Sequence, residues 1–202
     1  MLAFSFKSSY LCIVIHRQTF FNMVQNIIAW YAQANDADKT AINWYKEAHQ
    51  LAQKHPMGIE AGSAILAAYS INESWKRNVE HFENECNGIT PRCMPVSKQK
   101  AAQIHEAVEL CEIGRLPSIL NGQKVKCFYA NILNPFEFGV VTIDRHALKV
   151  AGIDSTKPTK KQYLAASEAY CEAAKIVGLL PSELQAVTWV TFRRLTGKAF
   201  YG

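Results

Sequence analysis

The chain has 202 residues, of which 49% are hydrophobic and 19% are charged. This length and composition are ordinary for a soluble globular protein and predict one domain with a hydrophobic core of its own. The net charge of +5 permits a nucleic-acid partner without requiring one. Six cysteines without a secretory signal argue against a disulfide scaffold and predict reduced thiols.

The first 22 residues are apolar but are interrupted by charged side chains such as Lys7 and Arg17. Their uninterrupted apolar run, residues 10–15, is far too short to span a bilayer, and no signal-peptide cleavage site follows it. A well-formed helical pattern begins at Met23. We therefore expect residues 1–22 to be a poorly packed arm or an upstream-start extension, and residues 23–202 to form a single α-helical domain.

Apolar residues with helical spacing predict helices over residues 24–31 and 41–52. Residues 59–69 are almost all small or apolar, so this helix is expected to be central and buried on all sides. A short polar break at Asn72 separates it from another helix that begins at Glu73.

Residues 84–96 contain two prolines and a glycine, and this composition predicts a loop. Cys86 and Cys93 lie in this region, but neither a CxxC pair nor a closely placed histidine completes a metal site, so we predict no metal. A helix is expected over residues 98–111, with Ser97 as its N-cap.

The segment 116–152 has the pattern loop, helix, loop, helix. Asn121-Gly122 predicts a tight turn, because glycine adopts positive φ without strain, and the helix after it ends before Pro135. The apolar run 140–143 leads to Asp144, which opens the second helix. Free N–H groups at the turn suit a phosphate. Asp144 suits either an ordinary N-cap or charge stabilisation and base catalysis.

The last third predicts two further helices. One runs over residues 159–177 and ends at Gly178, and the other follows Leu180 with Ser182 as its cap. The run 140–143 is the only β-like piece, and it is too short and isolated to make a sheet. The fold class is therefore all-α, with nine or ten helices.

A family resemblance is carried by Gly122-Gln123-Lys124, by the tripeptide 131–133 and by the segment TIDRHALKV at 142–150. These stretches resemble the core of the helix-hairpin-helix DNA glycosylases, in particular the endonuclease III-like members. The resemblance covers roughly residues 59–195 and implies the glycosylase helical bundle. One departure is Leu120, which stands where the family has the first of two hairpin glycines.

The resemblance assigns roles to individual residues. Asp144 takes the place of the catalytic aspartate, and His146 matches a histidine of the same segment. Lys124 matches the nucleophilic lysine of bifunctional members by motif, but Lys126, which lies 18 residues before Asp144, matches it by spacing. Both cannot aim at one point, because positions i and i+2 of a helix face apart. The nucleophile is one of the two, or the protein has none.

The resemblance also implies a partner, duplex DNA with an extruded base, bound by an intracellular monomer with no membrane attachment. Residues Asn121–Gln123 would hold a phosphate, and Asn72, Ser74 and Trp75 would line the base pocket, although Trp75 suits a core position equally well. No cofactor is expected. The four-cysteine iron–sulfur cluster of some members has no counterpart, because Cys171 is the only cysteine in the last third.

Three alternatives remain beside a DNA glycosylase that acts on a damaged or modified base. A non-catalytic DNA-binding module on the same fold accommodates the degenerate hairpin and the modest charge. An enzyme that processes a modified thymine or another hypermodified base keeps the fold and changes the chemistry, and a small viral protein would suit this role. A purely structural protein would make Asp144 and Gly122 coincidental.

Overall fold

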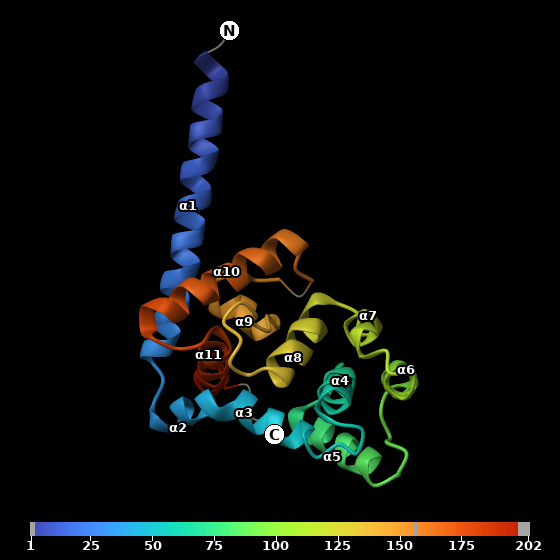
Figure 1. Cartoon of the computed structure of the whole chain (residues 1–202). Coiled ribbons are helices and arrows are strands. Elements are labelled where there is room, and N and C mark those ends of the chain that lie inside the picture. Colours follow the sequence, from blue (N-terminus) through green and yellow to red (C-terminus); the bar gives the residue numbers. More distant parts are fainter. Residues whose placement is uncertain (1–2, 156, 198–202) are drawn as a thin grey trace.

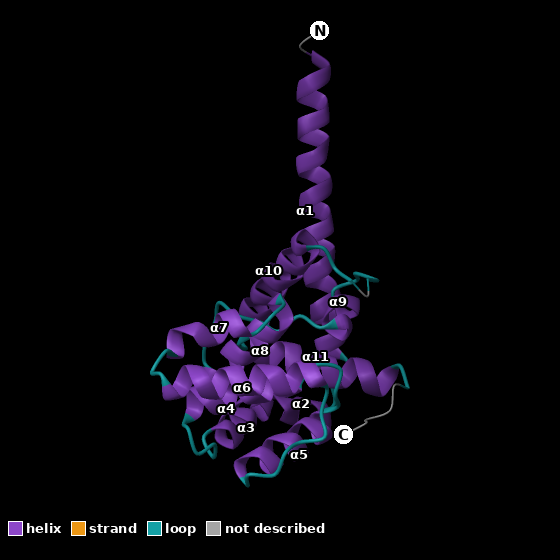
Figure 2. Ribbon diagram, turned by 90° about the vertical axis from the view of Figure 1, so that its right-hand side faces the viewer, coloured by secondary structure: helices purple, strands orange, loops and turns teal. Residues whose placement is uncertain are grey.

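The computed structural model describes residues 3–155 and 157–197, and side chains from residue 17 onwards. The described residues are helical or irregular and contain no strand, so the all-α prediction is confirmed. The helices are joined by loops (Figure 2). The helices are α1 (Ala3–Ala32), α2 (Asp36–Lys39), α3 (Trp44–Ala52), α4 (Ile59–Tyr69), α5 (Trp75–Cys86), α6 (Pro95–Glu109), α7 (Leu116–Ile119), α8 (Gln123–Leu133), α9 (Arg145–Val150), α10 (Lys160–Val177) and α11 (Pro181–Leu195), with 3₁₀ turns at Thr40–Asn43 and Ile113–Arg115 (Figure 1).

The buried side chains form two hydrophobic clusters. The first cluster is built by α3 to α8 and includes Leu66 and Phe82, both almost fully buried. The second cluster is built by α1, α9, α10 and α11 and includes Ile27 and Tyr170. Helix α8 serves both clusters, because Cys127 packs in the second and its neighbour Phe128 in the first. The segment that follows α8 therefore starts at the junction of the two clusters.

Helix α4 is the centre of the first cluster, as its small and apolar sequence predicts. Every residue from Ala61 to Tyr69 is buried, and the helix contacts α3, α5, α6 and α8. The close approach to α3 depends on Gly62. A Cβ at this position would overlap the carbonyl oxygen of Ala52 and would lie 2.9 Å from Cβ of His55.

Gly62→Ala is expected to lower the free energy of unfolding by about 2 kcal/mol, because the added methyl group meets backbone atoms that cannot move aside cheaply. Urea denaturation measures the loss. Gly114→Ala is the matched control, since a Cβ there meets nothing within 4 Å, and it should change stability by less than about 0.5 kcal/mol. Equal stability of the two variants would show that α3 and α4 can separate without cost.

Helix α1 is longer than the sequence pattern predicts. It begins at Ala3 rather than at Met23 and continues unbroken to Ala32, because no proline or glycine interrupts this stretch. Its first half projects away from the other helices, and its second half packs on α10 and α11 (Figure 1). The expected arm at residues 1–22 lies partly outside the described residues, at positions 1 and 2. No helix of the described chain has the length and apolar character needed to cross a membrane.

Two predicted N-caps are wrong for the same reason. Helix α6 begins at Pro95 with Met94 as its N-cap, and α11 begins at Pro181 with Leu180 as its N-cap. Proline favours the first helical position, because its φ is already helical and its missing N–H would have no partner there. Ser97 and Ser182 therefore lie inside the first turn, where both side chains are buried.

Candidate active site

The hairpin between α7 and α8 presents the N-terminus of α8 to solvent. Gly122 is the N-cap with φ of 84°, a conformation that glycine adopts without strain. Residues 121–124 are exposed, so the first N–H groups of α8 are open to a ligand. Leu120, two residues before Gly122, is fully buried in the first cluster. The hairpin is therefore anchored by an apolar side chain.

Lys100 contacts the end of α7, immediately before the hairpin turn. This lysine of α6 is buried, and its Nζ donates a hydrogen bond of 2.6 Å to the carbonyl oxygen of Ile119. Burial lowers the pKa of Lys100. The contact fixes α7 to α6 immediately before the turn.

Asp144 is the N-cap of α9. Its Oδ1 accepts hydrogen bonds from the backbone N–H groups of His146 (2.9 Å) and Ala147 (2.8 Å). Its Oδ2 accepts a hydrogen bond of 3.1 Å from the indole Nε1 of Trp189 on α11. The carboxylate is half-buried, so it is fixed by three donors without being sealed from solvent.

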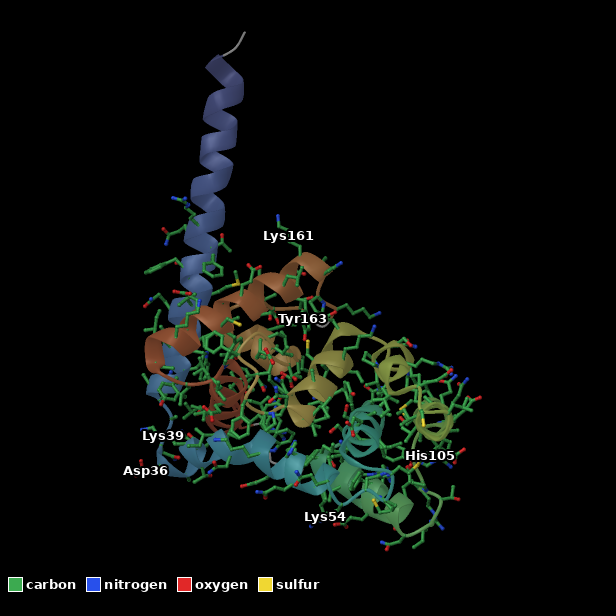
Figure 3. The ribbon with its side chains drawn as sticks, viewed as in Figure 1. Asp36, Lys39, Lys54, His105, Lys161 and Tyr163 are labelled. Atoms are coloured by element: carbon green, nitrogen blue, oxygen red, sulfur yellow. The ribbon has the colours of Figure 1, made fainter. Side chains whose placement is uncertain are left out.

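The extended segment that ends in Asp144 is tied to two helices. Asn131 of α8 donates through Nδ2 to the carbonyl oxygen of Val140 (2.9 Å) and accepts from the Thr142 hydroxyl at Oδ1 (3.0 Å). The phenolic oxygen of Tyr163, on α10, accepts a hydrogen bond of 3.1 Å from the N–H of Ile143. Tyr163 lies between α10 and α8 (Figure 3). These contacts place the hairpin helix and Asp144 on one connected unit.

Two buried tyrosines lie near Asp144, one from each cluster. The hydroxyl of Tyr45 donates to Oε1 of Gln185 (3.0 Å), and the hydroxyl of Tyr170 lies 3.1 Å from Oγ1 of Thr188. Burial raises the pKa of both phenols, and the charge of Asp144 adds to the rise. Both groups are therefore neutral hydrogen-bonding side chains at physiological pH, and Asp144 lies where the two clusters meet.

Cationic and aromatic side chains surround the carboxylate. The Arg193 guanidinium lies over the Trp189 ring, 4.5 Å from its centroid, and His146 is buried with its ring 6.1 Å from that of Trp189. Burial lowers the pKa of Arg193, the charge of Asp144 raises it and that of Arg145 lowers it further. Arg193 and Arg145 therefore place positive charge beside the carboxylate.

The two candidate lysines differ in their surroundings. Lys124 is exposed in the first turn of α8, whereas Lys126 is half-buried. Among residues 17–155 and 157–197, neither lysine forms an ion pair with Asp144. Their roles as nucleophiles remain predictions.

The base-pocket candidates lie at the start of α5 and in the turn before it. Ser74 caps α5 by accepting from the N–H of Arg77, and Asn72 is in the turn before it with φ of 57°. Trp75 packs on Trp44, with ring centroids 4.6 Å apart, at the edge of the first cluster. Trp75 also packs on Phe128 of α8, with ring centroids 6.4 Å apart. That the three residues line a base pocket remains a prediction.

Sequence reasoning missed the residues that fix Asp144. Trp189 lies 45 residues from its acceptor along the chain, and no local pattern pairs the two. Asn131 belongs to a stretch that carries the family resemblance, but its bridge to Val140 and Thr142 has no local signal. Contacts of this kind become visible only when the helices are assembled.

A family model matches residues 12–196, a range that includes the hairpin, Asp144 and Trp189. The chain belongs to the DUF7178 family. This family is described as one of unknown function. The DUF7178 match begins within α1, upstream of Met23. No curated protein and no solved structure matches the chain.

Proposed function

We propose that this DUF7178 protein is a DNA glycosylase-like enzyme of the helix-hairpin-helix type that removes a damaged or modified base. The observation that carries the proposal is the bridge made by Asn131. This side chain ties α8, which opens at the exposed hairpin, to the segment that ends in Asp144. The bridge holds the N-terminus of α8, which would bind a phosphate, at a constant distance from the Asp144 carboxylate. Cleavage of a glycosidic bond beside a bound phosphate requires such a fixed distance.

The proposed reaction breaks the bond between the base and C1′ of the sugar. The target nucleotide leaves the stack, because this bond is unreachable inside a duplex. The base departs with the bonding electron pair, and positive charge develops on the sugar. Asp144 stabilises this charge, since its three hydrogen bonds hold the carboxylate in place before the reaction begins. Water then adds to C1′ and gives up a proton, leaving an abasic site.

A lyase step is possible only if a lysine replaces water as the nucleophile. The amine would attack C1′ and form a Schiff base after sugar-ring opening. Lys126 is the stronger candidate of the two, because it is half-buried and lies 18 residues before Asp144.

Borohydride trapping on duplex oligonucleotides with an abasic site tests the lyase step. We expect a covalent protein–DNA complex that is lost in Lys126→Ala and retained in Lys124→Ala, which serves as the matched control on the same helix. Loss in Lys124→Ala alone would reverse the assignment. Base release without trapping, on a panel of damaged-base duplexes, would establish a glycosylase that uses water.

One observation favours a non-catalytic DNA-binding module instead. Both carboxylate oxygens of Asp144 already accept hydrogen bonds, as an N-cap needs and a general base does not. A module of this kind would bind DNA with salt-dependent affinity and neither release bases nor form a trapped complex. The same assays, with a DNA-binding measurement beside them, therefore separate the two functions.

A further inference from the structure

Three side chains that can ligate a metal meet at the far side of the first cluster. His55 lies in the turn after α3, Glu85 near the end of α5 and His105 on α6. One nitrogen or oxygen atom of each lies within 4.8 Å of the others. His105 is labelled in Figure 3, away from α9 and α11. This cluster is separate from the surroundings of Asp144.

Glu85 is the unusual member of the cluster. Its side chain is only 10% exposed, and neither carboxylate oxygen has a hydrogen-bond partner among the described residues. Oε1 lies 2.7 Å from Nε2 of His105, a distance at which the two side chains form an ion pair when the imidazole is protonated. A buried carboxylate needs a neighbouring cation, and either a protonated His105 or a metal ion in the place of that proton supplies one.

We propose that His55, Glu85 and His105 bind a divalent transition-metal ion, with zinc as the best match. Two imidazoles and one carboxylate are a ligand set that zinc accepts in tetrahedral geometry. The His105 side chain is 37% exposed, so the ion has a route from solvent and a fourth position for water. The bound ion would fasten the turn after α3 to α5 and α6.

The distances allow this with small side-chain movements. Ligand atoms about 2.0–2.1 Å from a tetrahedral ion lie about 3.3 Å from one another, closer than the 4.8 Å limit of the cluster. Nδ1 of His55 accepts a hydrogen bond of 3.2 Å from the Met57 amide, so Nε2 is the nitrogen that would coordinate the ion. Coordination through Nε2 would place the ring proton on Nδ1, and the Met57 amide would then donate to solvent instead. His105 contributes the adjustable ligand, because its ring is at the surface.

Calorimetric titration of the EDTA-treated full-length protein with zinc chloride tests the site. We expect one ion per chain and a melting temperature that rises with zinc concentration, because the ion binds only the folded state. His105→Gln should weaken zinc binding by more than about 10-fold, because even the loss of a group that only orients a metal ligand costs about 10- to 100-fold in affinity. Cobalt should give the visible absorption of a tetrahedral ion in the wild type.

Glu80→Gln is the matched control, since Glu80 is an exposed carboxylate on the same helix as Glu85, and it should bind zinc like the wild type. Glu85→Gln should lose the site while remaining folded, because it removes a buried charge. Absence of stoichiometric binding in the wild type would overturn the proposal. Unchanged binding in His105→Gln would overturn it as well, by showing that zinc is held elsewhere on the chain.

Discussion

Asp144→Asn should lower the rate of base release by about 10²- to 10⁴-fold in single-turnover assays on the preferred damaged-base duplex. The substitution removes the negative charge that stabilises the developing cation on the sugar. It keeps the helix start, because asparagine is as good an N-cap as aspartate. The substitution also puts an amide donor where Oδ2 accepts the Trp189 indole N–H, so a kinetic loss far larger than any fall in melting temperature would report chemistry rather than folding.

Asp154→Asn supplies the control for this result. Its side chain is 91% exposed, and its only described ion pair, with Lys149, is long at 3.6 Å, so neither the rate nor the stability should change. Trp189→Phe belongs in the same assay, because it removes the Nε1–H donor to Asp144 and keeps an aromatic ring. Its loss should be smaller than that of Asp144→Asn. A wild-type rate in Asp144→Asn would remove this carboxylate from the mechanism.

Local sequence signals predicted the parts of the candidate site that lie within one element. Gly122 in a positive-φ turn and Asp144 at a helix start are determined by backbone geometry over a few residues. Gly178 at the end of α10 and the burial of α4 belong to the same class. Each of these features is determined by residue types within a few positions of the chain, so a single sequence is enough to predict it.

The remainder depends on assembly of the helices. The hydrogen bond from Trp189 to Asp144, the Asn131 bridge and the buried Lys100 join residues that are distant in sequence or on different elements. Each of these polar side chains resembles an ordinary surface or core position when only its own helix is considered. A buried polar group destabilises the fold unless it has a hydrogen-bond partner, and the packing of the helices decides which group is that partner. For the same reason, the ligand set His55, Glu85 and His105 has no recognisable spacing along the chain.

The position of Asp144 at the junction of the two clusters has a consequence for stability. Helix α11 reaches both clusters, through Ala186 in the first and Leu184 in the second. It also supplies the indole donor to Asp144. Any contact that fixes α11 therefore helps to fix the candidate site. One such contact is the ion pair between Arg194, at the end of α11, and the buried Asp38.

Asp38→Ala should lower the free energy of unfolding by about 3 kcal/mol, measured by urea denaturation at pH 7. Asp38 is 2% exposed, and Arg194 donates to its carboxylate from Nε and from Nη2 (2.6 Å). Thr191 donates a further hydrogen bond of 3.2 Å, and the carboxylate closes a capping box with Asn35. The substitution removes one of the two hydrogen bonds of the capping box and leaves the Arg194 guanidinium without its carboxylate partner. Asp36→Ala, at an exposed position of the same helix, should cost less than about 0.5 kcal/mol.

The same pair predicts how the difference changes with pH. The hydrogen bond from Arg194 holds the pKa of Asp38 below its ordinary value of 3.8. A carboxylate whose pKa is lower in the folded state contributes stability that is fully present above the unfolded pKa and is lost as pH falls through the folded pKa. The stability gap between wild type and Asp38→Ala should therefore be constant from neutral pH down to about pH 5 and shrink below it. A gap that stayed constant to pH 2 would mean that packing and capping, rather than the charge pair with Arg194, fix the end of α11.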